Sequence, residues 1–106
     1  MSKSSITTTD PDWLHNPHAG ELVASEFMEP LGLSFDALAA SLEIAAPRLE
    51  GVVAGRIRMD ADLDLRLARY FRMSEGFFLG LQTDHELLEA KRTLNGDLDR
   101  IVPRGA

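Results

Sequence analysis

The sequence predicts an all-α domain of five main helices. Apolar residues recur three and four positions apart in successive stretches of the chain, and this spacing places them on one helix face. Residues typical of helix starts and ends lie between these stretches, and no stretch convincingly predicts a strand. With 106 residues and an apolar share of 44%, the chain has the size of one domain with one core.

The chain divides into three predicted segments. Residues 1–14 form a loose arm that is rich in Ser and Thr, and its last two residues, Trp13 and Leu14, can dock on the domain. Residues 15–93 carry the helical domain. Residues 94–106 form a short C-terminal extension, in which positions 97–102 can make one last helical turn.

The first helix is expected to end at Pro30, because a proline disfavours the helical conformation of the residue before it. Glu21 lies in its first turn, where a negative charge is favourable. The apolar residues expected on its inward face are Leu22, Val23, Phe27 and Met28.

The stretch from Ser34 to Gly55 holds two short helical patterns joined by a turn. Ser34 can cap the first helix, Pro47 suits the first turn of the second, and Gly55 suits its end. Helices this short are unstable alone, so they must support each other through apolar contacts. The residues expected in these contacts are Leu38, Leu42, Ile44, Leu49 and Val52. The pattern predicts a helix-turn-helix, whose second helix can enter the major groove of DNA.

The next helix is predicted to start at Ala61, with Asp60 as its cap. Asp64 falls within the apolar stripe of this helix, which otherwise contains Leu63, Leu67, Ala68 and Phe71. If Asp64 were buried it would need a partner such as an arginine, because an unpaired buried charge is costly. We therefore expect Asp64 at the edge of the stripe, near solvent.

A last long helix follows Ser74, its predicted cap, and ends at Asn95-Gly96. Its apolar stripe contains Phe77, Phe78, Leu81, His85 and Leu88. Such a stripe is more often a core than a ligand surface, although the core of a dimer interface has the same composition.

The charge is unevenly distributed along the chain. The net charge is −6, which argues against a general polyanion binder. Residues 1–46 carry −6, whereas residues 47–72 hold six arginines against four acids. The only positive segment thus begins at the second helix of the predicted helix-turn-helix. Arg66, Arg69 and Arg72 have an equally good explanation as the solvated face of a helix.

Several functions are not expected from this composition. The chain has no cysteine, no apolar run long enough to cross a bilayer and no apolar start of the secretory type, so we expect a cytoplasmic protein. His15, His18 and Glu21 are the only cluster that resembles metal ligands, and helix capping explains them better. No nucleophile–base set and no phosphate-binding glycine loop is present. We expect no enzyme, no metal and no cofactor.

The motifs from Asn16 to Leu88 resemble the HigA family of antitoxins. In order they are HNPHAGE, EPLGLS, ALAASLEI, PRLEGVVAGR, ADLDLRLARYF, SEGFFLGLQ and HEL, of which RLARYF followed by S-x-x-F-F-L-x-L-Q is the most specific. HigA proteins are XRE-type helix-turn-helix proteins with a lambda-repressor-like fold. The resemblance implies a homodimeric repressor that binds a palindromic operator upstream of its own gene pair. It also implies a RelE-like, HigB-type toxin that cleaves messenger RNA and is neutralised by complex formation.

The resemblance also assigns roles to individual residues. It places Ala46, Arg48 and Glu50 toward the groove of DNA. It places Ser34, Arg56 and Arg58 at phosphates. The dimer interface it implies lies on the last long helix, at Phe78, Leu81, His85 and Leu88.

The chain departs from the family pattern in the second helix of the motif. Ala46 stands where an arginine is usual, Glu50 replaces an asparagine, and Gly51 costs about 1 kcal/mol of helix propensity relative to alanine. Base reading relies on Arg, Lys, Asn or Gln side chains, so we expect a changed operator or weakened DNA binding. Two alternatives therefore remain: a module that mainly binds a basic toxin through its acidic N-terminal part, and a stand-alone regulator without a toxin.

Overall fold

The computed structural model describes residues 15–105. The predicted N-terminal arm, with Trp13 and Leu14, lies outside this range. Within it every regular element is helical, as the sequence predicts, and the molecule is elongated, with extents of 51 × 30 × 24 Å. No helix of the described part is long and apolar enough to cross a membrane.

The first helical run combines three elements, α2 (Ala19–Leu22), the π-helix η1 (Val23–Met28) and α3 (Glu29–Leu31). The prediction that Pro30 stops this run is wrong, because the run continues to Leu31 and ends at Gly32, which has φ 64°. The π-helical register shifts the hydrogen bonds to five-residue steps, as where Glu29 N donates to Ala24 O. The run closes at the left-handed Gly32, where Gly32 N donates to Glu29 O and Leu33 N donates to Met28 O. Pro30 has no N–H to donate, so one carbonyl group of the preceding turn lacks its donor within the helix. Pro30 is exposed, so water can donate to that carbonyl group instead.

The predicted helix-turn-helix is present as α4 (Phe35–Leu42) and α5 (Ala46–Val53). Ser34 caps α4 as predicted, with its Oγ accepting from Ala37 N at 3.0 Å. Gly55 follows α5 with φ 84°, a conformation that favours glycine. The residues that hold the two helices together are Leu38, Leu42, Leu49 and Val52, all buried, and Ile44, half-buried.

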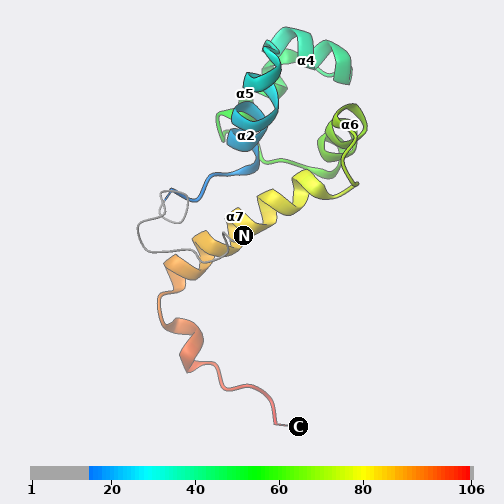
Figure 1. Ribbon diagram of the computed structural model, residues 1–106. Coiled ribbons are helices and arrows are strands. Elements are labelled where there is room, and N and C mark those ends of the chain that lie inside the picture. Colours follow the sequence, from blue (N-terminus) through cyan, green and yellow to red (C-terminus); the bar gives the residue numbers. More distant parts are fainter. Residues whose placement is uncertain (1–14, 106) are drawn as a thin grey trace.

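The remaining helices are α6 (Ala61–Phe71) and α7 (Phe77–Leu94), followed by the 3₁₀-helix η2 (Asp97–Arg100). In Figure 1, α2, α4 and α5 form one group, while α7 extends away from it toward the C-terminus. Asp60 caps α6 by accepting from Leu63 N at 2.9 Å, and Asn95 and Gly96 end α7 with positive φ angles. These three features confirm the sequence predictions. The predicted domain boundaries at residues 14 and 93 stay predictions.

Asp64 contradicts two expectations. It is not at a solvent-exposed edge but is only 2% exposed, and its partner is not an arginine. Its carboxylate accepts from three backbone amides at the start of α7: Gly76 N at 2.6 Å, Phe78 N at 2.8 Å and Leu79 N at 2.9 Å. The first N–H groups of a helix have no partner within the helix and favour a negative charge. Asp64, and not the predicted Ser74, therefore caps the start of α7.

We expect Asp64→Ala to lower the free energy of unfolding by about 2–4 kcal/mol, because three backbone donors, one of them in a buried bond, lose their acceptor. Chemical denaturation followed by circular dichroism measures this. Ser74→Ala is the matched control and should cost less than about 0.5 kcal/mol, since only the Ser74 backbone carbonyl takes part in the turn. Equal losses in the two variants would restore Ser74 as the cap.

Candidate nucleic-acid interface

Helix α5 is held against the molecule by very close backbone contact. A Cβ atom on Gly20 of α2 would lie 2.0 Å from the carbonyl oxygen of Val52, so only glycine fits at this position. A Cβ atom on Gly51 would lie 2.5 Å from Cδ1 of Ile57. Gly51 thus lets the chain after α5 fold back over the helix, and the propensity that it costs has a structural reason.

The solvent-facing side of α5, which we call the outer face, consists of Pro47, Glu50 and Ala54. These residues are exposed and lie three and four positions apart, as the residues of one helix face do. Glu50 is the only charged residue among them. The outer face is therefore open to a partner, but it offers one carboxylate and no cation.

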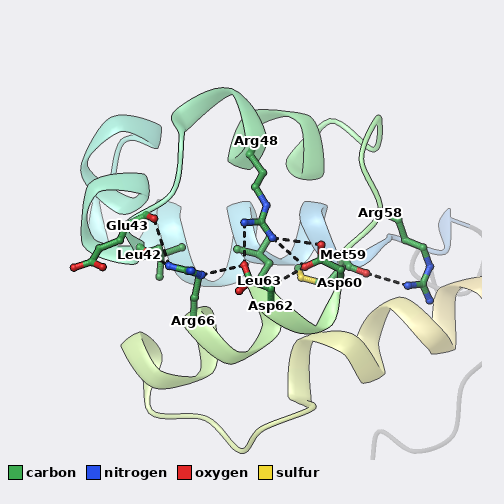
Figure 2. A network of polar contacts seen from close by, with 9 residues as sticks. All are labelled: Leu42, Glu43, Arg48, Arg58, Met59, Asp60, Asp62, Leu63 and Arg66. Atoms are coloured by element: carbon green, nitrogen blue, oxygen red, sulfur yellow. Dashed lines mark hydrogen bonds and ion pairs between the residues drawn. The ribbon is translucent and has the colours of Figure 1, made fainter.

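Arg48 does not lie on this outer face, which corrects its predicted place toward the groove. Its guanidinium group turns to the start of α6, where it lies 3.1 Å from Asp60 Oδ1 and 2.9 Å from Asp62 Oδ2 (Figure 2). The side chain is only 30% exposed. Ala46 is half-buried against the core, so of the three residues predicted to face the groove only Glu50 lies on the outer face, and its contact with DNA stays a prediction.

Arg66 extends the same network toward α4. Its Nε lies 3.0 Å from Asp62 Oδ2, and its Nη1 donates to the Leu42 carbonyl oxygen at 2.8 Å (Figure 2). The hydrogen bonds from Arg66, and next those from Arg48, hold the pKa of Asp62 below its ordinary value. The interpretation of Arg66 as a merely solvated residue is therefore wrong, because it binds the last carbonyl groups of α4. Arg69 and Arg72 are exposed.

Arg58 points in a different direction from Arg48. Its Nη2 donates to Glu86 Oε1 on α7 at 2.9 Å, and its Nη1 donates to the Met59 carbonyl oxygen at 3.1 Å. Arg58, which the resemblance places at a phosphate, is thus paired with a carboxylate of α7 in this conformation, and its phosphate contact stays a prediction. Within residues 15–105, Arg56 is exposed and has no ion pair, and Ser34 is exposed at the start of α4.

The histidine cluster caps a helix. His18 Nδ1 accepts from Gly20 N at 3.1 Å, while Glu21 accepts from His18 N, and the two together form a capping box. His15 Nε2 lies 3.1 Å from Glu21 Oε2. Burial lowers the pKa of His18, which favours the neutral ring that capping requires. No potential metal-binding group of side chains occurs in the described part of the chain.

The four residues predicted for the dimer interface have different environments. Phe78 has no exposed surface in its own protomer, so its side chain cannot contact a second chain, and that part of the prediction is wrong. His85 Nδ1 lies 2.9 Å from the carbonyl oxygen of Asn16, which ties α7 to the segment before α2. Leu81 and Leu88 are half-buried, and their place at an interface stays a prediction.

No family model matches the sequence, but individual relatives do. The sequence is 36% identical over 86 residues to virulence-associated protein I of Dichelobacter nodosus, covering 81% of this chain and 79% of that protein. The fold matches the Pseudomonas aeruginosa antitoxin HigA, solved with the higBA promoter, at a TM-score of 0.73 and 32% identity, covering 81% of this chain and 95% of that one. This chain belongs to the HigA family of antitoxins. An addiction module antidote protein of a HigA family from Coxiella burnetii is also similar, at a TM-score of 0.75 and 28% identity, covering 82% and 96% of the two chains.

Sequence reasoning missed two acids at the arginines of this HigA-family chain. Neither Asp62 nor Glu86 was predicted as the partner of an arginine. The i, i+4 spacing of Asp62 and Arg66 was a usable signal, since residues at this spacing are neighbours on a helix. Nothing in the sequence pairs Arg58 with Glu86, which lies 28 residues further on.

The Arg58–Glu86 pair gives a test by titration. Hydrogen bonds from Arg58, and next from Gln82, lower the pKa of Glu86 to about 2. A depressed carboxylate pKa stabilises the fold above the ordinary glutamate pKa, and this contribution is lost as the pH falls toward 2. We expect NMR titration to show Glu86 still ionised where ordinary glutamates are half protonated, and Arg58→Ala to raise its midpoint.

Arg100→Ala is the matched control for this titration, because it removes a distant arginine that pairs with Asp97 on the C-terminal extension. It should leave the Glu86 midpoint unchanged. An ordinary Glu86 midpoint in the unaltered chain would show that the pair does not persist in solution.

Proposed function

We propose that this HigA-family chain is a DNA-binding antitoxin that represses transcription of its own gene pair. The observation that carries the proposal is the exposed α5, held against α2 by the Gly20–Val52 contact and against α4 by apolar residues. An exposed second helix in a helix-turn-helix is the element that enters the major groove. The P. aeruginosa relative, HigA, was solved with the higBA promoter, which supports the same role here.

The residues that α5 offers to DNA are not the arginines that most often contact bases. Glu50 is the polar group on the outer face of α5, and a carboxylate accepts from the N4 amino group of cytosine. The methyl group of Ala54 suits contact with the methyl group of thymine. Arg56, exposed just beyond α5, supplies a phosphate contact. We therefore propose an operator read mainly through Glu50 and positioned through Arg56.

A protein partner is the second part of the proposal. Residues 15–46 contain five acids and no Lys or Arg, and four of the acids, Glu26, Glu29, Asp36 and Glu43, are exposed. A surface of one sign attracts a partner of the opposite sign and speeds the encounter. This surface fits a basic, RelE-like toxin that the chain neutralises by complex formation. If DNA reading has been lost, toxin binding is the function that remains.

DNA binding is tested with the duplex immediately upstream of the chain's own reading frame and a random duplex of equal length. We expect the upstream duplex to bind more tightly, and Glu50→Ala to lose about 1–3 kcal/mol of this discrimination. Arg56→Ala should weaken both duplexes roughly threefold to tenfold and reduce the salt slope by about 0.9, because it removes one phosphate contact. Binding at several salt concentrations measures both effects.

Lys91→Ala is the matched control for Arg56→Ala, since it removes one exposed positive charge on α7, far along the chain from α5. It should change neither affinity. Equal binding of the upstream and random duplexes would contradict sequence-specific repression.

Toxin binding is tested by co-expressing the chain with the product of the adjacent reading frame. We expect the two proteins to purify together and the chain to protect cells from the toxin. Because the acids attract the partner, the double variant E26Q/E29Q should slow association, most strongly at low salt. A chain that fails to protect cells from its neighbour is not its antitoxin.

A further inference from the structure

The side-chain network at the start of α6 has a consequence for DNA selectivity, on the basis that the chain binds DNA as proposed. Two arginines, Arg48 and Arg66, lie among two carboxylates, Asp60 and Asp62, so the group has no net charge (Figure 2). It thereby neutralises two of the six arginines in the one positive segment of the chain. The positive charges of Arg48 and Arg66 are therefore balanced by neighbouring carboxylates in this conformation, whereas Arg56 remains exposed.

The members of the network are not equally bound. Asp60 also caps α6 through Leu63 N at 2.9 Å, and Asp62 also contacts Arg66 at 3.0 Å. The guanidinium group of Arg48, in contrast, makes its polar contacts only to these two acids within the described residues. Arg48 can therefore leave the network while both carboxylates keep a partner and the cap of α6 stays in place.

The ion pairs of Arg48 are also weak enough to be exchanged. The side chains of Asp60 and Asp62 are 56% and 53% exposed, and exposed ion pairs add little stability and are screened by salt. Arg48 follows Pro47, a residue of the outer face, in the first turn of α5. A long arginine side chain at this position can turn from α6 to a phosphate that flanks the groove occupied by α5.

We infer that Asp60 and Asp62 are specificity-determining residues, which hold Arg48 away from DNA until a correctly seated duplex offers it a phosphate. On random DNA, where α5 is not seated, Arg48 stays with the two acids and adds nothing to affinity. On the operator, Arg48 exchanges the acids for a phosphate oxygen and releases a counterion. The acids thus lower non-specific binding more than specific binding, and α5 needs no arginine on its outer face for this effect.

The test uses Asp62→Asn, which removes the negative charge that faces Arg48. The substitution keeps an oxygen that can accept from Arg66 and leaves the Asp60 cap untouched. We expect it to tighten binding to a random duplex roughly threefold to tenfold and to steepen the salt slope by about 0.9, because one more arginine reaches a phosphate. Binding to the upstream duplex should change less, so the ratio of the two affinities should fall. Asp84→Asn, which neutralises an exposed acid on α7, is the control for net charge and should change neither value.

The same substitution in an Arg48→Ala background separates the inference from simple repulsion. If Asp62 acts through Arg48, its replacement there should have little effect on random-duplex binding. An equal tightening in both backgrounds, or weaker binding by Asp62→Asn, overturns the inference. If the unaltered chain binds the upstream duplex specifically but Asp62→Asn leaves the affinity for the random duplex unchanged, the inference is overturned while the proposed function stands. If the unaltered chain binds neither duplex, and Asp62→Asn binds neither as well, the proposed function fails, and the inference with it.

Discussion

One buried carboxylate determines how the long C-terminal helix joins the rest of the molecule. Asp64 lies inside the core with 2% of its surface exposed and accepts hydrogen bonds from three amides at the start of α7. An ionised carboxylate tolerates burial only where donors replace the water it has lost, and the free N–H groups of a helix start provide such donors. Because these donors point along the helix axis, the bond fixes the direction of α7 as well as its first residue. The contacts of α7 with Asn16 and with Arg58 depend on that direction.

Carboxylates on neighbouring helices neutralise arginines around α5. A sequence with six arginines in 26 residues suggests a cationic surface, yet Arg48 and Arg58 are each paired with carboxylates on other helices. Exposed ion pairs contribute little to stability, so their main effect is on what the surface offers to a partner. A surface neutralised in this way favours selectivity over affinity, because general attraction to phosphates is the source of non-specific DNA binding. The net charge of −6 has the same effect.

The sequence predicts those features of this fold that depend on neighbours along the chain. The caps by Ser34 and Asp60 and the end of α7 at Asn95-Gly96 follow from bonds that span at most a few residues. Features that depend on distant partners were wrong or missed. Asp64 was placed near solvent because the amides that donate to its carboxylate lie 12 to 15 residues further on. Arg48 was placed in the groove because the acids that it pairs with lie at the next helix. The π-helical turn before Pro30 was missed because a proline ordinarily ends a helix, and the change of register that accommodates it has no sequence signal.

The close packing around α5 bears on the choice between a DNA-binding repressor and a module that binds only a toxin. Gly20 and Gly51 have no side chain, and a Cβ atom at either position would collide with Val52 or Ile57. Gly20 fixes the position of α5 against α2, whereas Gly51 makes room for the Ile57 side chain of the segment after α5, at a cost in helix propensity. Toxin binding through the acidic surface of residues 15–46 does not require α5 to be held in this way. The close support of an exposed α5 therefore favours a helix that enters DNA, and the reading of bases by Glu50 is part of the proposal.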